Sequence, residues 1–207
     1  MRLALHLAIA AFLAAGAVCA ADRSPLKGLN GDMEQIAETA KGMNKWLMRQ
    51  IQKGCDFGDG PVAYTPAGWG INIGVAKFCS IDAAEVPEDR PNVHGGTASM
   101  YVAAKAPTHV QCTGCRLEPG KYRLSFWTKG TGKVHVITYN YKDTYHYAGV
   151  GGVLLSAAAT DKWTRTPVVD VEIGRERPET TYSILVFLVE KGAKVYIDDL
   201  VLEAAGS

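Results

Sequence analysis

The sequence has 207 residues, with 22 Lys and Arg against 21 Asp and Glu, and 47% of its residues are hydrophobic. A chain of this length and composition can form one domain with a sizeable core. Its nearly neutral charge gives no electrostatic reason to expect a nucleic acid or an anionic membrane as a partner.

The N-terminal residues are typical of an export signal. An apolar run from Leu3 to Val18 contains no acid, and Val18-Cys19-Ala20 supplies the small residues that precede a cleavage site. A lipoprotein anchor on Cys19 is the weaker alternative, because Val18 precedes it instead of Gly or Ala. The run is too short and too rich in alanine to predict stable membrane insertion. We therefore expect a signal peptide over residues 1–20 and a secreted, periplasmic or cell-surface protein.

After a linker over residues 21–28, the predicted domain occupies residues 29–203. Its first residues, Asn30-Gly-Asp-Met-Glu34, predict an edge strand or a turn. From Met33 to Ile51 apolar residues recur at helical spacing. We expect an amphipathic helix there that packs on the outside of a sheet, weakened or divided at Gly42.

Beyond the Gly- and Pro-rich stretch from Cys55 to Gly68, the periodicity changes to that of strands. Short β-branched and aromatic runs alternate with turn signals, among them Lys129-Gly-Thr-Gly132. Nine or ten such strands predict an all-β fold: an antiparallel β-sandwich jelly roll with one added N-terminal helix. The predicted strands are Trp69–Phe78, Ala98–Ala104, His109–Leu117, Lys121–Lys129, Lys133–Tyr141, Tyr145–Leu155, Trp163–Ile173, Thr180–Glu190 and Ala193–Leu202.

The last predicted strand breaks its own alternation. Val195 and Ile197 share one face, whereas Leu200 and Leu202 fall on the opposite face, because side chains alternate with period two. A bulge at Asp198-Asp199 would bring both apolar pairs to one core. Two acids in an apolar strand are unfavourable unless they are paired, hydrogen-bonded or bound to a cation. The sequence leaves two interpretations: one acid solvated and one capping a loop, or an oxygen-rich cation site.

The cysteine content favours disulfide bonds. Cys19 would leave with the signal, so that Cys55, Cys79, Cys112 and Cys115 remain. An even number in an exported protein predicts two disulfides with three possible pairings. The alternatives for Cys112-Thr-Gly-Cys115 are a redox pair or half of a zinc site, but no second CxxC or His cluster accompanies it.

Aromatic residues alternate along several predicted strands. Trp127 sits among polar neighbours, Tyr139 and Tyr141 share one strand face, and Tyr145 and Tyr147 alternate after the next turn. In a hairpin, tyrosines of the two strands would meet on one face of a sheet. One interpretation is a second layer of core, since a buried tyrosine can keep its hydroxyl in water. The other is a platform for sugar rings, with all five residues as candidate carbohydrate-binding residues.

Little in the sequence indicates catalysis. No Gly-x-Ser-x-Gly elbow, His-Glu-x-x-His, P-loop or Gly-x-Gly-x-x-Gly stands in a suitable context. Carboxylates are numerous, but none belongs to a distinctive constellation. We expect no enzyme. A small jelly-roll lyase or glycosidase is an alternative that would require a cleft with a paired acid and base.

Five motifs resemble, in their order, those of carbohydrate-binding modules of the family 4 and 9 type, which have a galactose-binding-like β-sandwich. The resemblance spans the chain from Asn30 to Leu202 and implies a jelly roll that binds poly- or oligosaccharide without cleaving it. The motifs are Asn30-Gly-Asp-Met-Glu34, Pro66-Ala-Gly-Trp69, Leu117 to Gly130, Thr160-Asp-Lys-Trp163 and Val195 to Leu202.

The resemblance also implies a structural Ca²⁺ ion that joins the first motif to the last strand, with Glu34 and Asp198 as ligands. Calcium takes oxygen ligands of this kind. The predicted helix departs from the family pattern, which has a short loop at that place. Our leading hypothesis is a secreted, non-catalytic carbohydrate-binding module. The alternative is a cell-envelope structural domain that uses the sandwich and the helix to hold a protein partner.

Overall fold

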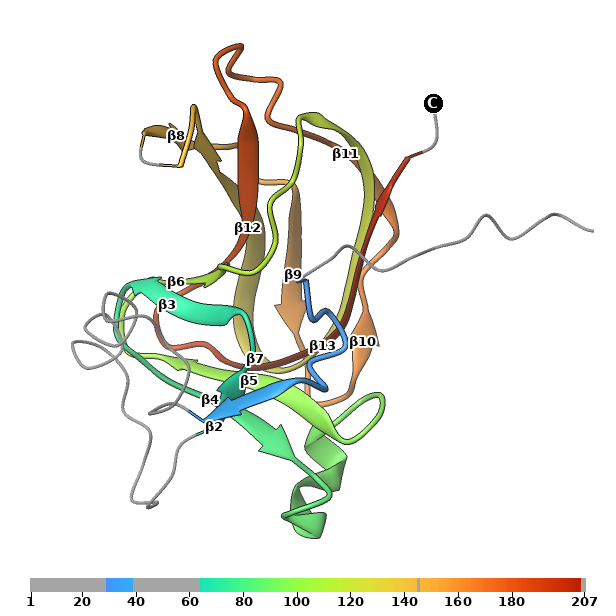
Figure 1. The fold of residues 1–207 in the computed structure, drawn as a ribbon. Helices are drawn as coiled ribbons and strands as arrows, with labels where there is room; N and C mark the ends of the chain where they lie inside the picture. Colours follow the sequence, from blue (N-terminus) through green and yellow to red (C-terminus); the bar gives the residue numbers. More distant parts are fainter. Residues whose placement is uncertain (1–28, 39–63, 145, 206–207) are drawn as a thin grey trace, which may run out of the picture.

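The computed structural model describes residues 29–38, 64–144 and 146–205 (Figure 1). These residues form thirteen β-strands and one short 3-10 helix, η1, which confirms the predicted all-β fold. The elements are β1 (Ile36–Glu38), β2 (Tyr64–Pro66), β3 (Trp69–Ile73), β4 (Ala76–Asp82), η1 (Pro87–Asn92), β5 (Ala98–Ala104), β6 (Thr108–Cys112), β7 (Gly120–Tyr141), β8 (Tyr147–Val150), β9 (Leu155–Ala159), β10 (Thr164–Arg165), β11 (Val169–Ile173), β12 (Tyr182–Val189) and β13 (Lys194–Ala204).

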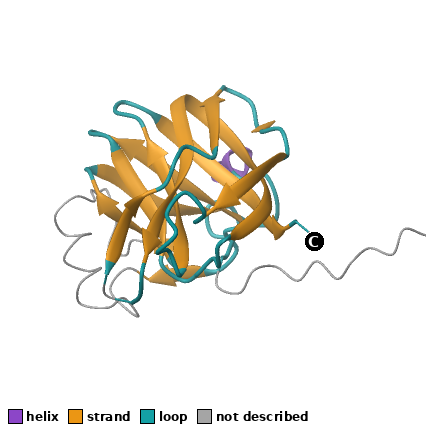
Figure 2. Cartoon of the chain, turned by 90° about the horizontal axis from the view of Figure 1, so that it is seen from above, coloured by secondary structure: helices purple, strands orange, loops and turns teal. Residues whose placement is uncertain are grey.

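Two antiparallel sheets pack face to face as a β-sandwich (Figures 1 and 2). In the first sheet β4, β5, β13 and the first half of β7 lie side by side, and β10 and β11 pair with the other edge of β7. The second sheet contains β3, β6, β12 and the second half of β7, with β8 and β9 beyond it. Strands β1 and β2 form a small separate pair.

The core between the sheets follows from alternation along each strand. Leu124 and Phe126 of β7 point into it from the first sheet, and Val134 and Val136 point into it from the second. Phe187 of β12 packs against Phe126 across the sandwich, with ring centroids 5.4 Å apart. Burial of each large apolar side chain contributes about 1.5–3 kcal/mol. The alternate residues therefore face outward on both sheets, and those two outer faces are where binding residues can lie.

Strand β7 crosses from one sheet to the other without a turn, so the turn predicted at Lys129-Gly-Thr-Gly132 is wrong. Gly130 and Gly132 instead bend a continuous strand, with φ values of 125° and 92°. A Cβ at Gly130 would lie 2.0 Å from the carbonyl oxygen of Lys194 in β13. Glycine permits both the positive φ and the close approach of the two backbones. Glycine, which often marks a turn, lets one strand join two sheets at this place.

The predicted bulge in the last strand is confirmed. The register of β13 against β7 shifts between Asp198 and Val201, and Asp199 has a φ of 43°. Val195 and Ile197 before the bulge, and Leu200 and Leu202 after it, are all buried in the same core.

The first motif forms a turn that packs against this bulge. Asn30 adopts a φ of 43°, and its side-chain amide donates to the carbonyl oxygens of Gln35 and Ala67 at 2.9 and 3.0 Å. The backbone N–H of Leu200 donates to the Gly31 oxygen at 2.8 Å. Asparagine tolerates the left-handed conformation and bonds its own backbone, which explains the Asn-Gly pair at this turn.

The helix predicted from Met33 does not begin there. Met33 is buried with a φ of 57°, and Ile36–Glu38 form β1, which pairs with β2. Tertiary pairing overrides the helical spacing of these residues, because intrinsic propensity is only a weak preference. The remainder of the predicted helix, residues 39–51, and the predicted signal peptide, residues 1–20, lie outside the described residues.

Candidate functional site

Three tyrosines form a row across the outer face of the second sheet, which we call the tyrosine row. Tyr182 of β12 pairs in register with Tyr141 of β7, which pairs in turn with Tyr147 of β8. The rings of Tyr182 and Tyr141 are parallel, with centroids 5.0 Å apart and 4° between their planes. The Tyr147 ring meets that of Tyr141 edge-on at 5.6 Å. The predicted meeting of Tyr141 and Tyr147 across a hairpin is confirmed.

The tyrosine row is accessible to a ligand. The Tyr147 side chain is 52% exposed, and Tyr141 and Tyr182 are half-buried. Partial burial raises the pKa of Tyr141 and of Tyr147, so both hydroxyls stay protonated at neutral pH and can donate and accept hydrogen bonds. Adjacent strands are about 4.8 Å apart, and a row over three strands therefore extends about 10 Å. Flat apolar rings with polar edges suit a ligand that is itself amphipathic.

Tyr182 is a site residue that the sequence analysis missed. Its strand was predicted as Thr180–Glu190, and the strand places Tyr182 on the same face as Ile184, Val186 and Leu188. The signal that could have found it is this alternation. However, the partner of Tyr182 is Tyr141, which lies in a different predicted strand, and alternation alone does not say which strands are neighbours.

Tyr139 has a different environment from the row. Its side chain is only 2% exposed and packs with Ile137, Ile184 and Val186 in a second apolar cluster on the outer face. Its hydroxyl shares a hydrogen bond with Nδ1 of His109. Burial raises the pKa of Tyr139 to about 12. The interpretation as a second layer of core therefore holds for Tyr139, whose ring meets that of Tyr147 edge-on at 5.7 Å. Tyr145 lies outside the described residues.

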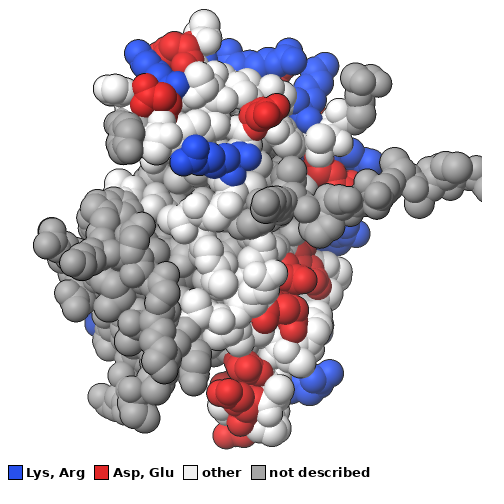
Figure 3. Space-filling model, viewed as in Figure 1, with Lys and Arg blue, Asp and Glu red and all other residues white. Residues whose placement is uncertain are grey.

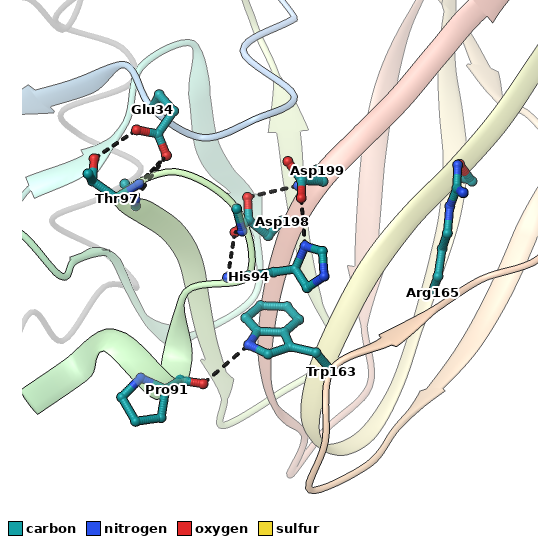
Figure 4. Close-up of polar contacts among 11 residues, drawn as sticks. Glu34, Pro91, His94, Thr97, Trp163, Arg165, Asp198 and Asp199 are labelled. Atoms are coloured by element: carbon teal, nitrogen blue, oxygen red, sulfur yellow. Dashed lines mark hydrogen bonds and ion pairs between the residues drawn. The ribbon is translucent and has the colours of Figure 1, made fainter.

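Trp127 lies on the opposite side of the sandwich, on the outer face of the first sheet. The imidazole of His94 stacks on its indole, with centroids 3.8 Å apart and 21° between the planes. Trp163 meets His94 edge-on at 5.5 Å, and its indole N–H donates to the Pro91 oxygen at 3.2 Å. Figure 4 shows His94 and Trp163 in this cluster. The loop after β4 therefore covers one face of Trp127, and the structure does not bring Trp127 together with the tyrosines.

Three carboxylates fix that loop to the first motif and the last strand (Figure 4). Glu34 accepts hydrogen bonds from the backbone N–H and the hydroxyl of Thr97, at 2.8 and 2.7 Å. Asp198 Oδ2 accepts from the backbone N–H groups of His94 and Gly95, at 3.0 and 3.2 Å. Asp199 Oδ2 lies 2.6 Å from Nδ1 of His94. This arrangement matches the first of the two interpretations of the paired acids, because Asp199 is half-exposed and Asp198 caps the loop.

The buried acid has unusual electrostatics. The Asp198 side chain is fully buried, and this burial raises its pKa to about 7, although hydrogen bonds from the backbone of Asp199, His94 and Gly95 act in the opposite direction. A carboxylate in such an environment is a charge that lacks full compensation. A nearby cation would favour its ionised form.

The carboxylates of Glu34 and Asp198 are the type of ligand that an oxygen-seeking cation takes. Glu34 and Asp198 come from opposite ends of the chain and both bind the segment from His94 to Ala98. Among the described residues, no group of three or more His, Cys, Asp or Glu side chains is arranged to hold a metal ion. A calcium ion held here would therefore take its other ligands from backbone carbonyl oxygens or water.

The predicted disulfide bonds do not appear among the described cysteines. Cys79, Cys112 and Cys115 all retain their thiol groups. Cys79 lies on the first sheet opposite Tyr101, whereas Cys112 and Cys115 are buried in the core and share a hydrogen bond. The apolar core accommodates these two as small hydrophobic residues, which is usual for buried cysteine. Cys55 lies outside the described residues.

The surface seen in Figure 3 carries charged side chains toward its two ends, with a broad uncharged area between them. The lower end is acidic near η1, to which Glu88 and Asp89 belong. Within the described ranges, no helix is long and apolar enough to cross a membrane.

No protein-family profile and no curated protein sequence matches the chain. Solved structures do resemble it. The CBM22-1 xylan-binding domain of Paenibacillus barcinonensis Xyn10C superposes with a TM-score of 0.50 at 13% identity, over 69% of this chain and 89% of that domain. The CBM22-2 domain of the same protein has a TM-score of 0.47 at 15% identity, over 67% of this chain and 92% of that domain.

A third similar structure is the enzymatically active domain of the bacteriophage CBA120 tailspike protein 4. Its TM-score is 0.45 at 13% identity, over 67% of this chain but only 19% of the tailspike chain. At these levels of identity the similarity concerns the fold. Together with the two antiparallel sheets, it gives the class: this chain has the β-sandwich fold of carbohydrate-binding modules.

Proposed function

We propose that this chain is a non-catalytic carbohydrate-binding module that holds a poly- or oligosaccharide on the tyrosine row. The observation that carries the proposal is the in-register alignment of Tyr182, Tyr141 and Tyr147 on three adjacent strands of an outer sheet face. The fold of carbohydrate-binding modules supports it further.

The chemistry of the row suits a sugar. A sugar ring has apolar C–H faces and polar hydroxyl edges, so it can lie on a tyrosine ring while its hydroxyls bond to groups at the ring edges. The protonated hydroxyls of Tyr141 and Tyr147 supply such groups. Tyr139 and His109 share a hydrogen bond on this face, but the Tyr139 side chain is only 2% exposed, so its hydroxyl has little access to a bound sugar. Binding without cleavage is the function that this arrangement supports best.

A binding screen tests the proposal. The purified protein is incubated with insoluble and soluble polysaccharides, and reducing-sugar release is followed in the same tubes. We expect at least one polysaccharide to bind without release of reducing sugar. The double variant Tyr141→Ala/Tyr147→Ala should lose that binding, because it removes two of the three rings.

The matched control is Tyr101→Ala/Tyr196→Ala. These two half-buried tyrosines contact each other on the outer face of the first sheet, with centroids 4.7 Å apart and 34° between the ring planes. The control should bind as the wild type does. Equal binding by the wild type and the row variant would contradict the tyrosine row as the site. Release of reducing sugar would instead favour the lyase or glycosidase alternative, and absence of both would favour a cell-envelope interaction domain.

We also propose the calcium ion, with Glu34 and Asp198 as ligands. Its support is the buried, incompletely compensated Asp198 carboxylate and the convergence of both acids on one loop. When bound, the ion would neutralise these carboxylates and stiffen the junction of the first motif with β13. Thermal unfolding with and without chelator should differ by several degrees, because a ligand specific to the folded state stabilises it. An unchanged transition, with no calcium found by elemental analysis, would remove the site.

Export and the finer family assignment belong to the same proposal. The apolar N-terminal run supports a cleaved signal peptide and a secreted, periplasmic or cell-surface location. The ordered motifs support membership of the family 4 and 9 type. N-terminal sequencing of the protein recovered from its host would locate the cleavage, and an N-terminus retained at Met1 would exclude it.

A further inference from the structure

One end of the tyrosine row carries an arginine. The Arg116 guanidinium lies over the ring of Tyr182, with 4.7 Å from its Cζ atom to the ring centroid. Arg116 is exposed and belongs to the segment that leads into β7, where Leu117 bonds to Ser183 beside Tyr182. A guanidinium stacked on an aromatic ring is held flat, while its N–H edge stays available for hydrogen bonds.

A second arginine packs against the strand at the other end of the row. A Cβ at Gly149 of β8 would lie 2.7 Å from the Arg177 Cζ atom, so glycine at this position leaves room for the guanidinium on the backbone. Burial raises the pKa of the neighbouring Tyr147, and the positive charge of Arg177 opposes that rise. The row therefore runs from a basic group beside β12 to a basic group beside β8.

Neither arginine is neutralised within the part of the chain that the structure describes. No carboxylate there forms an ion pair with Arg116 or Arg177. Two acids close in sequence to Arg177 have other partners. Glu176 accepts a hydrogen bond from Asn140 at 2.8 Å, and Glu179 pairs with Lys142 at 3.9 Å. Two guanidinium groups that form no ion pair among the described residues thus flank the tyrosine row, and they would attract an anionic ligand to it.

We infer that the tyrosine row binds an acidic polysaccharide, with a sugar ring on the tyrosines and a uronate carboxylate paired to the guanidinium of Arg116. This inference rests on the proposed function. A carboxylate is planar and accepts two parallel N–H bonds from a guanidinium, which adds geometric selectivity to the charge attraction. Arg177 provides the second positive end, which suits a polymer that carries carboxylates on more than one sugar.

The test compares each acidic polymer with its own neutral form. Polygalacturonate and glucuronoxylan are each assayed beside the same polymer after chemical reduction of its carboxyl groups, so the sugar backbone stays constant. We expect at least one acidic polymer to bind roughly tenfold or more tightly than its reduced form, since hydrogen bonds to charged groups are the stronger ones. The affinity for the acidic polymer should also fall as salt is added.

The variant Arg116→Gln should lower affinity for the acidic polymer roughly tenfold and leave affinity for the reduced polymer unchanged. Arg116→Lys should recover only part of the loss, because lysine keeps the charge but lacks the planar fork. The control is Arg123→Gln, an exposed arginine on the first sheet that lies 3.9 Å from Asp170. Unfolding temperatures of all variants should match the wild type.

Two results would overturn the inference while leaving the proposed function intact. One is equal binding of the acidic polymers and their reduced forms. The other is acidic binding that Arg116→Gln and Arg123→Gln affect alike. If neither polymer form binds, and the wider panel of polysaccharides also fails, the proposed function falls and the inference falls with it.

Discussion

The outer faces of the two sheets both carry aromatic side chains, but they arrange them differently. On the second sheet, Tyr182, Tyr141 and Tyr147 contact one another across strands and remain accessible. On the first sheet, Trp127 is stacked under His94, and the loop that carries His94 is tied to Asp198 and Asp199. Aromatic residues thus stay accessible on one face and attach a loop on the other.

This difference shows what decides the role of a surface aromatic ring. Alternation along β7 places both Trp127 and Tyr141 outward. What separates them is the neighbouring segment. The connection between β4 and β5 carries η1 and folds back over the first sheet, where Lys129 donates to the Pro91 oxygen at 2.7 Å. We therefore expect the cluster of Trp127, His94 and Trp163 to govern stability and the tyrosine row to govern binding.

The largest expected effect concerns Asp198. Burial raises its pKa to about 7, above the value of about 3.9 expected in an unfolded chain. Between these values the folded state binds more protons than the unfolded state, so the free energy of unfolding should fall as pH rises from about 4 to about 7. In chelator, the fall attributable to this residue should reach roughly 3 kcal/mol. Urea unfolding of the wild type and of Asp198→Asn across this range measures it.

The Asn variant isolates the contribution of that one carboxyl group. It should show a shallower fall of stability with pH than the wild type in chelator. Added calcium should remove the fall in the wild type, because the cation favours the ionised carboxylate. A wild type that gains stability relative to Asp198→Asn as pH rises in chelator would contradict the raised pKa.

Trp127→Ala should give the next largest effect. It removes the indole on which His94 stacks and frees one side of the loop, and we expect a loss of roughly 2–3 kcal/mol in the free energy of unfolding, somewhat below the range for a fully buried aromatic residue. Affinity for the polysaccharide should not change. Chemical denaturation and a binding titration on the same sample check both parts. A loss of affinity with full stability would assign Trp127 to the binding site after all.

Tyr147→Ala should show the opposite pattern. Because the side chain is 52% exposed, the loss in stability should stay within about 0.5 kcal/mol. Because the ring stands at the open end of the row, affinity should fall by about 2 kcal/mol, the size expected for an aromatic anchor of an interface. Isothermal titration calorimetry measures the loss. An affinity within twofold of the wild type would exclude Tyr147 from the contact.

Tyr139→Phe should have the smallest effect. The variant removes the hydroxyl that shares a hydrogen bond with His109 but keeps the buried ring. We expect a loss of about 1 kcal/mol in stability, the usual net value of such a bond. Affinity should be unchanged, since the hydroxyl is buried and bonded to His109. A larger loss of affinity than of stability would show that Tyr139 contacts the ligand directly.

The sequence predicted the sandwich because period-two alternation and turn signals are local properties. The phase break at Asp198-Asp199 even located the bulge, since Val195 and Leu200 had to reach one core. The sequence could not predict the path of β7, because a glycine such as Gly130 is equally compatible with a turn and with a bend in a continuous strand. The predicted start of the helix at Met33 was also wrong, since Ile36–Glu38 pair with β2.

The site was predictable only where local patterns determine which residues meet. Tyr141 and Tyr147 are joined by a short connection, so their meeting follows from a hairpin. Tyr182 lies about forty residues further on, and its place beside Tyr141 depends on the order of strands in the folded sheet. Likewise, the burial of Tyr139 and the cover over Trp127 come from distant segments that no local pattern encodes.

The most direct test of the account is to ask which face the sugar touches. An NMR titration with a soluble oligosaccharide of the polymer that binds in the screen would follow the ring protons of the aromatic residues. The account predicts shifts that concentrate on Tyr141, Tyr147 and Tyr182, with Trp127 and Trp163 unmoved. Shifts that concentrate on Trp127 and Trp163 instead would contradict it.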